Sequence, residues 1–468
     1  MKALSLIFLV FVSFTFIHCK IAPLYKAKTP LVRSTLSNGY NYVRNYIIVL
    51  KRDKLINNLL GEVAYTFSRE YHFQPNFTFS LGDFGGYVIE ERVVQDYLSL
   101  IRNLDVVEYI EEDAEIQAYV PTTSKPQADC IHQKSGEELW GLSRISRHAS
   151  PSSFQGSSYR YSNVDSGKGV TIYVVDSGVN INHDDFGTQA SQGFTATWLH
   201  NLEGPEDKNG HGTHVAGIAA GSKHGVAKEA SVVAVKVLNS EGAGQLANLI
   251  EGIDWMVDDF KKKKSANKKA KAVANLSLGL SASGQSVTLE RCLREAVNLG
   301  IPVAVAAGND RSDACYWSPA RMNEVITVGA TDKADRISHF SNYGSCLDIF
   351  APGESIKSTY HTTNTATNTL QGTSMASPFV AGVMARYLSY HDESIKPAKV
   401  YEWLLSVSSQ DTIDFRYSYI KQSSPNKMLY MGCGGDLSAS YSPRLIPTVF
   451  LMMLSLINYY FVVGNVKE

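Results

Sequence analysis

The chain has 468 residues, enough for about three domains. Its 44 lysines and arginines are balanced by 45 aspartates and glutamates, so no overall positive charge attracts nucleic acid, and no nucleic-acid partner is expected. Hydrophobic residues make up 44% and charged residues 19%, which excludes a mainly disordered chain.

The first 19 residues have the pattern of a secretory signal peptide. Lys2 precedes an apolar run from Ala3 to Ile17, which has the length of a signal-peptide core and is short for a membrane span. A buried N-terminal helix is the alternative interpretation. A signal peptide over residues 1–19 predicts a protein of the secretory pathway, extracellular or attached to the cell surface. Asn76, in the sequon Asn-Phe-Thr, is then a predicted glycosylation site.

Residues 40–120 have the pattern of a small α+β domain. Its strand-like runs are Tyr46–Leu50, Phe77–Leu81, Tyr87–Ile89 and Val106–Ile110, and its helical segments are Lys54–Glu70 and Glu91–Leu104. The order βαββαβ is compatible with a ferredoxin-like split βαβ sheet. No cluster of catalytic residue types lies in it. Residues 121–138 are polar and contain Pro121 and Pro126, which predicts an exposed linker that proteases can cut.

From residue 139 onward, apolar strand-like runs alternate with helical segments. The strand-like runs are Val170–Asp176, Ala230–Leu238, Lys271–Gly279, Ile301–Asn309 and Ile326–Ala330, and the helical ones include Ala247–Phe260 and Val287–Leu299. This alternation predicts an α/β domain with a mostly parallel sheet and helices on both faces. In such folds, ligands bind beyond the carboxyl ends of the strands. The lysine-rich segment Lys261–Lys271 is interpreted as a solvated loop, with contact to an anionic partner as the alternative.

The C-terminal end is hydrophobic. Residues 445–463 contain no charged residue and are long enough to cross a bilayer as a helix, and residues 433–444 form a small, polar spacer before them. This pattern predicts membrane attachment, either by a transmembrane helix or through a GPI-attachment signal. A core helix of a third domain is the alternative.

Three segments of the α/β region carry a carboxylate, an imidazole and a hydroxyl. Asp176 lies where a buried strand ends, His211 begins a helix, and Ser374 lies at a turn before the helical Pro378–Tyr390. Taken singly, each residue has a structural explanation as a cap or turn residue. Taken together they suggest nucleophilic catalysis, because a serine hydroxyl needs a base such as imidazole, and a buried carboxylate fixes the tautomer of that imidazole.

In chain order, the segments VVDSGV, NGHGTHVAG, VAAGND and GTSMASP resemble those of the subtilisin-like serine proteases, in which the triad order is Asp, His, Ser. WGLSRIS, GVAKEASVVAVKVL, SPARMNEVITVGATD and FSNYGSCLDIFAPG resemble the proteinase K and aqualysin branch. The resemblance covers nearly all of residues 139–432. It implies a three-layer subtilisin-like catalytic domain there, with serine endopeptidase activity on polypeptide substrates through an acyl-enzyme.

The resemblance also assigns roles within the site. It makes Asp176 the orienting carboxylate, His211 the general base and acid, and Ser374 the nucleophile, while Asn309 donates to the oxyanion of the tetrahedral intermediate. Two segments resemble the strands that pair with the substrate backbone on either side. They are Ser277, Leu278 and Gly279, and Gly242, Ala243 and Gly244.

The cysteines and a possible cation site follow from the same resemblance. Cys315 and Cys346 match positions that form a disulfide in aqualysin-like relatives, whereas Cys292 lies in a helical segment and is expected to be a buried thiol. Asp348, with the carbonyls of Asn323 and Val325, matches a structural calcium site of proteinase K-like proteins. No cofactor is expected to be required for the chemistry itself.

Residues 40–120 resemble the inhibitory propeptide of these proteases, so the chain is expected to be made as a zymogen that processes itself near Tyr119–Ala128. The propeptide is then a partner of the catalytic domain. A catalytically silent binding protein that retains its propeptide is the main alternative. A lipase lacks support because Ser374 is not in a G-x-S-x-G elbow, and a zinc hydrolase because no H-E-x-x-H occurs.

Overall fold

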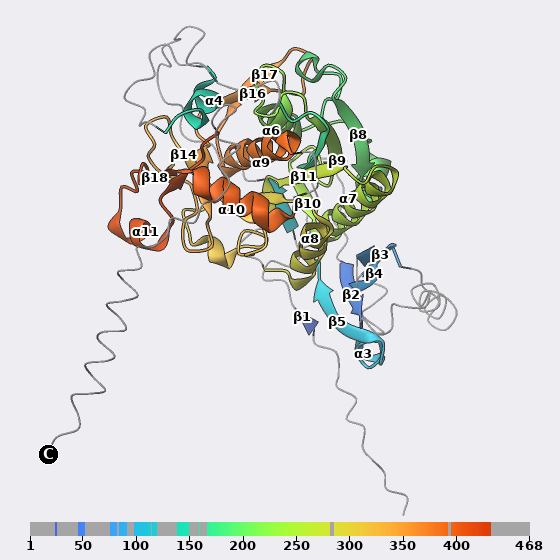
Figure 1. The fold of residues 1–468 in the computed structure, drawn as a ribbon. Coiled ribbons are helices and arrows are strands. Elements are labelled where there is room, and N and C mark those ends of the chain that lie inside the picture. Colours follow the sequence, from blue (N-terminus) through green and yellow to red (C-terminus); the bar gives the residue numbers. More distant parts are fainter. Residues whose placement is uncertain are drawn as a thin grey trace, which may run out of the picture.

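The computed structural model describes residues 24–25, 45–51, 75–81, 84–90, 98–113, 115–118, 138–148, 159, 166–280, 285–391 and 395–431. Outside these lie the predicted segments 1–19, 433–444 and 445–463, the helical segment Lys54–Glu70, and two cysteines, Cys130 and Cys433. Among the described helices, none has both the length and the apolar character needed to cross a bilayer. The described residues form a small N-terminal sheet and a larger α/β unit (Figure 1).

The small unit is a mixed five-stranded sheet in the order β1-β5-β2-β4-β3. Its elements are β1 (Leu24–Tyr25), β2 (Asn45–Leu50), β3 (Phe77–Leu81), β4 (Phe84–Glu90), α3 (Leu98–Arg102) and β5 (Val107–Glu112). All six residues of β2 are buried. Because side chains alternate between the two faces of a strand, both faces of β2 are covered. Ile48 and Leu50 pack within the small unit, whereas Ile47 and Val49 belong to a core shared with the larger unit.

The larger unit is built on a nine-stranded sheet in the order β18-β19-β15-β14-β13-β11-β7-β9-β8. Its strands are β7 (Val170–Asp176), β8 (Ala190–Thr195), β9 (Ser231–Lys236), β11 (Lys271–Leu276), β13 (Val303–Ala306), β14 (Ile326–Thr331), β15 (Ile349–Pro352), β18 (Ser409–Gln410) and β19 (Lys427–Met428). All neighbours are parallel except β18 and β19. The mostly parallel α/β fold predicted from the sequence is confirmed.

Helices cover both faces of this sheet (Figure 1). They are α6 (His211–Ala220) and α9 (Thr373–Tyr390) on one face, and α7 (Leu246–Ala266) and α8 (Val287–Leu299) on the other. The central strand β7 has apolar side chains on both faces, so both faces need cover. Ile172 and Val174 belong to the core shared with α6 and α9, and Tyr173 and Val175 belong to the core shared with α7 and α8.

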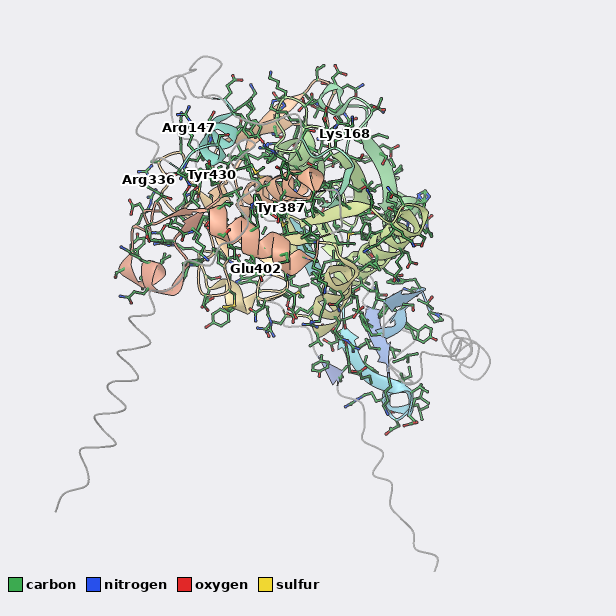
Figure 2. The ribbon with its side chains drawn as sticks, viewed as in Figure 1. Arg147, Lys168, Arg336, Tyr387, Glu402 and Tyr430 are labelled. Carbon is green, nitrogen blue, oxygen red and sulfur yellow. A yellow bond between two sulfur atoms is a disulfide. The ribbon has the colours of Figure 1, made fainter. Side chains whose placement is uncertain are left out.

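The remaining elements are shorter. They are β6 (Glu115–Ala118), α4 (Trp140–Ile145), η4 (Asp184–Phe186), α5 (Thr197–Leu202), β10 (Ala243–Gln245), β12 (Leu278–Leu280), η5 (Ala314–Tyr316), β16 (Ile356–Thr359), β17 (Thr367–Leu370), α10 (Pro397–Val407) and α11 (Ser418–Ser423). Helix α10 packs on α9, where the ring of Tyr387, labelled in Figure 2, stacks on Trp403 at 4.0 Å between centroids.

Two sequence predictions about local structure were wrong. The run Lys271–Gly279 is not one strand, because β11 ends at Leu276 and β12 belongs to a separate three-stranded sheet with β6 and β10. The segment from residue 261 to 266 is not a loop but the end of α7. Lysine is a good helix former, and Lys263 also pairs with Asp259 one turn earlier.

A buried ion pair joins α4 to the loop that follows β14. The Arg144 guanidinium donates from Nε to Asp335 Oδ1 at 2.6 Å and from its NH2 group to Oδ2 at 2.9 Å, and the two side chains are only 1% and 2% exposed. A bidentate ion pair of this kind fixes both the position and the orientation of the two side chains. It ties the start of the larger unit to its C-terminal half.

We expect Asp335→Asn to lower the free energy of unfolding by about 3 kcal/mol, because the variant leaves the Arg144 charge buried without a counter-charge. Asparagine tolerates the positive φ of 55° at this position, so backbone strain is not added. Urea unfolding measures the change. The matched control is Arg336→Ala, which breaks a pair whose arginine is 49% exposed and should cost less than about 1 kcal/mol. Equal effects of the two variants would contradict the prediction.

Candidate active site

Asp176 and His211 form a buried hydrogen-bonded pair at the carboxyl end of the parallel sheet. Asp176 is the last residue of β7, and its Oδ1 accepts from Ser177 N at 2.7 Å and from His211 Nδ1 at 2.8 Å. Both side chains are almost completely buried. The pair leaves His211 Nε2 as the ring nitrogen for other chemistry, and within the described part of the chain that buried atom has no hydrogen-bond partner.

Asp207 fixes the start of the helix that carries His211. Its Oδ1 accepts from Gly210 N at 2.8 Å, and its Oδ2 accepts from Thr213 N at 2.9 Å and from the Thr213 hydroxyl at 2.6 Å. Gly210 has a φ of 97°, which favours glycine immediately before the helix. A carboxylate at a helix N-terminus satisfies the unpaired N–H groups there. The sequence analysis did not single out Asp207, although Asp before a Gly-rich helix start is a recognisable capping signal.

Burial and charge act in opposite directions on His211. Burial alone lowers the pKa of its imidazole, but the charge and the hydrogen bond of Asp176 outweigh burial, so the pKa is raised above the ordinary value of 6.5. His214, one turn later, behaves differently. Burial lowers the pKa of His214 to about 3, and its Nε2 lies 3.1 Å from the carbonyls of both Ile356 and Asn368. His214 is therefore a neutral structural histidine.

Ser374 is the second residue of α9 and is completely buried. Its hydroxyl donates to the Ser277 carbonyl at 3.0 Å, and the Ser277 hydroxyl donates to the Ser374 carbonyl at 2.8 Å. The second bond has a local cause: the residue four positions on is Pro378, which has no N–H to donate to that carbonyl within the helix. Ser277 therefore connects the start of α9 to the end of β11.

Asn309 follows β13 and contacts the residue before Ser374. Its side-chain oxygen accepts from Thr373 N at 2.9 Å and from the Thr373 hydroxyl at 3.0 Å. With the oxygen held in this way, the Nδ2 end of the carboxamide is the end that can donate. The structure thus brings Asn309 beside the N-terminus of α9.

Strand β6, which follows the small unit in the chain, lies between the two segments expected to bind a substrate backbone. β6 pairs antiparallel with β10 on one side and with β12 on the other, so that Gln117 is opposite both Ala243 and Gly279, and Ala118 is opposite Leu278. Gly242 turns into β10 with a φ of 74°, and Ser277 directly precedes β12. The structure therefore places both predicted segments along one extended chain.

Two carboxylates at the end of the small unit cap two helices of the larger unit. Asp113 Oδ1 accepts from Ala247 N at 3.0 Å in the first turn of α7. Glu111 accepts from Thr288 N at 3.2 Å and from the Thr288 hydroxyl at the start of α8, and burial raises the pKa of Glu111. Sequence reasoning missed both residues, because a cap supplied from another unit leaves no local signal.

The other predicted site residues are also described. Cys315 and Cys346 form the disulfide implied by the resemblance, and Cys292 is a buried free thiol. Asp348 Oδ2 accepts from Thr327 N at 2.8 Å, and burial raises the pKa of Asp348 to about 6. Within the described ranges no three His, Cys, Asp or Glu side chains converge on a possible metal position. Asn76 is exposed at the edge of the small unit.

Comparisons with known proteins agree on one family. The chain matches the subtilase family over residues 167–419. It is 41% identical to the subtilisin-like serine protease Pen ch 18 of Penicillium rubens over 75% of this chain and 68% of that protein. It is 38% identical to the subtilisin-like protease 8 of Arthroderma otae, over 88% of this chain and 86% of that protein. A crystal structure of a cold-adapted subtilisin-like serine proteinase matches with a TM-score of 0.55 and 40% identity, covering 63% of this chain and 98% of that one.

We expect the His211 imidazole to titrate above 6.5, and its pKa to fall below that value in Asp176→Asn, where burial remains and the carboxylate charge is lost. Nuclear magnetic resonance of the histidine rings between pH 5 and 9 measures both midpoints. His214 provides the internal control, since it should stay neutral throughout. An unchanged His211 midpoint in the variant would show that Asp176 does not set this pKa.

Proposed function

The chain belongs to the subtilisin-like serine proteases, and we propose that it is an endopeptidase in which Asp176, His211 and Ser374 form the catalytic triad. The observation that carries this assignment is the buried Asp176–His211 pair, whose unused Nε2 is available to take a proton. Ser374 stands at the start of a neighbouring helix, on a turn fixed by Ser277 and Asn309.

In the proposed reaction, the Ser374 hydroxyl turns from the Ser277 carbonyl to His211 Nε2, gives up its proton there and attacks a peptide carbonyl. Asp176 keeps the proton on Nδ1 and stabilises the imidazolium that forms. The negative oxygen of the tetrahedral intermediate accepts from Asn309 Nδ2 and Ser374 N. His211 then gives its proton to the leaving amine, and water hydrolyses the acyl-enzyme through the same groups.

The slot between β10 and β12 supports an extended polypeptide as the substrate. It is filled here by β6, which uses both of its backbone edges. Recognition of this kind reads mainly the backbone, so broad specificity is expected. The same placement supports a zymogen, because β6, near the end of residues 40–120, blocks the slot. We assign residues 40–120 as an inhibitory propeptide and residues 139–432 as the catalytic domain.

The register of β6 supports a particular maturation cut. Ala118 is opposite Leu278 in an antiparallel pair, and the next residue of the partner segment is Ser277, whose carbonyl accepts from the Ser374 hydroxyl. A substrate chain in this register would therefore present the bond after the residue that follows Ala118. We therefore propose cleavage between Tyr119 and Val120. The signal peptide over residues 1–19 and membrane attachment through residues 445–463 stay predictions from the sequence. They are consistent with maturation in the secretory pathway.

A structural calcium ion at Asp348 is also proposed. The carboxylate of Asp348 and the carbonyls of Asn323 and Val325 make up an all-oxygen donor set, which suits a hard cation. The burial of Asp348 supports the assignment: burial raises the pKa of its carboxyl to about 6, so a bound cation would stabilise the charged form. Such an ion would stabilise the fold and take no part in the proposed chemistry.

We expect the full chain, made in a secretory host, to lose its propeptide and to show Val120 as the new N-terminus, whereas Ser374→Ala stays uncut because the nucleophile is missing. Intact-mass analysis and N-terminal sequencing measure both. The matched control is Ser377→Ala, which removes a buried hydroxyl one turn later in α9, bonded to Asn275, and should still be cut.

Equal cleavage of wild type and Ser374→Ala would assign maturation to another protease. Absence of cleavage in both would favour the silent binding protein. A new N-terminus other than Val120 would contradict the proposed cut site and leave the proposed triad unaffected.

We expect calcium at about a hundred times its dissociation constant to stabilise the Ser374→Ala chain by about 2.7 kcal/mol and to leave the same chain with Asp348→Asn unchanged. Thermal unfolding with and without calcium in the uncut Ser374→Ala chain measures the difference, and magnesium at equal ionic strength is the control. Equal calcium stabilisation of both chains would remove Asp348 from the site.

A further inference from the structure

A cavity of about 200 Å³ lies at the seam between the propeptide and the catalytic domain. We call it the seam cavity. Its propeptide wall includes Asn45, Asn76 and Phe77, and its catalytic-domain wall includes Trp198, Asn248 and Glu251. The wall thus combines aromatic rings with amide and carboxylate groups, a composition suited to a polar molecule that also has apolar faces.

One buried group in this wall is unsatisfied. Asn248 is only 4% exposed, and its Nδ2 has no hydrogen-bond partner among the described residues. A buried donor without an acceptor is costly and calls for an explanation. Close by on the same helix, Glu251 is held in place by Thr197, whose N–H donates to its carboxylate at 3.1 Å. The seam cavity therefore offers a donor and a fixed acceptor to a ligand.

The sequon residue Asn76 belongs to the same cavity. Asn76 is exposed, but its Nδ2 donates to Asn45 Oδ1 at 3.1 Å, and Asn45 is buried in the cavity wall. An N-linked glycan is attached through Nδ2 of the asparagine. A glycan on Asn76 would therefore start at the mouth of the seam cavity, with the second N–H of the amide still able to bond to Asn45.

We propose that Asn76 carries an N-linked glycan whose first sugar fills the seam cavity and helps hold the propeptide on the catalytic domain. In this arrangement the sugar accepts from Asn248 Nδ2, donates a hydroxyl to Glu251 and packs an apolar face on Trp198. The inference rests on the secretory zymogen proposed above, since glycan transfer requires that pathway.

The transfer itself needs an activated glycosyl donor, a lipid-linked sugar diphosphate of the secretory pathway. The bond from sugar C1 to Asn76 Nδ2 forms as the bond from C1 to the diphosphate oxygen breaks, and the amide nitrogen loses one proton. The finished glycan touches both units only while the propeptide is bound. It should therefore slow the release of the propeptide without touching the catalytic groups.

The test uses the full chain with Ser374→Ala, made in a glycosylating secretory host, so that the zymogen stays uncut. Four versions are compared: this parent, the parent with Thr78→Ala, the parent with Trp198→Ala, and the parent with both. Thr78→Ala removes the sequon and keeps Asn76, and Thr78→Ser, which keeps the sequon, is its matched control. Peptide mass analysis gives the occupancy of Asn76, and hydrogen exchange of β2 and of the first turn of α7 reports opening of the seam.

We expect Asn76 to be glycosylated in the parent. Thr78→Ala should make opening of the seam about fivefold more frequent, which corresponds to the loss of one good hydrogen bond. Trp198→Ala should produce a similar increase in the glycosylated chain and little further increase once the sequon is gone. Trimming the folded zymogen's glycan to its first sugar should leave the protection intact. In the active wild type, Thr78→Ala should shorten the lag between the maturation cut and the appearance of activity.

An unmodified Asn76, unchanged exchange after Thr78→Ala, or independent effects of Thr78→Ala and Trp198→Ala would each overturn the inference. Loss of protection on trimming to one sugar would do so as well. The exchange measurements do not depend on catalysis. If the proposed function were wrong, the wild type would instead stay uncut and inactive.

Discussion

The hydrogen bond between Asp176 and His211 is the interaction on which the proposed active site depends, and several parts of the fold hold the two residues in place. Asp176 is fixed by the central strand β7, and His211 by the capped start of α6. The hairpin of β16 and β17 then fastens α6 from the other side, since His214 contacts the carbonyls of Ile356 and Asn368. The same hairpin leads directly into the turn before Ser374. One short segment therefore connects the helix of His211 to the turn that carries Ser374.

The contact between the small unit and the larger unit uses the ends of two helices. Asp113 and Glu111 lie two residues apart at the end of the small unit, and they cap α7 and α8 respectively. Helix N-termini carry partial positive charge, so both carboxylates meet favourable partners. A cation–π contact runs in the other direction, from α8 to the small unit: the Arg291 guanidinium lies 4.3 Å from the ring centre of Phe84. The two units are thus joined by charge as well as by apolar packing.

Much of this organisation could be predicted from the sequence, because its signals are local. The strand Val170–Asp176 is a continuous apolar run, and its predicted bounds match β7. Asp176 and His211, identified from short motifs, do meet in space. What could not be predicted are features that depend on a distant partner: the pairing of β6 with two separate segments, the caps from Glu111 and Asp113, and the break at Ser277. The extension of α7 was misread because charge was given more weight than the helix propensity of lysine.

If the slot between β10 and β12 holds the substrate, as proposed, its shape alone limits which polypeptides can be cut. A chain that fills it becomes the middle strand of three, and both its edges must be free to bond. A strand inside a native sheet has at most one free edge, and a helix has none. Under the proposed mode of binding, native folds are protected by their own hydrogen bonds, and a segment must first open into a single extended strand. A protease that binds its substrate in this way acts as a sensor of unfolding, because the stability of a target protein, more than its sequence, decides how long that protein survives.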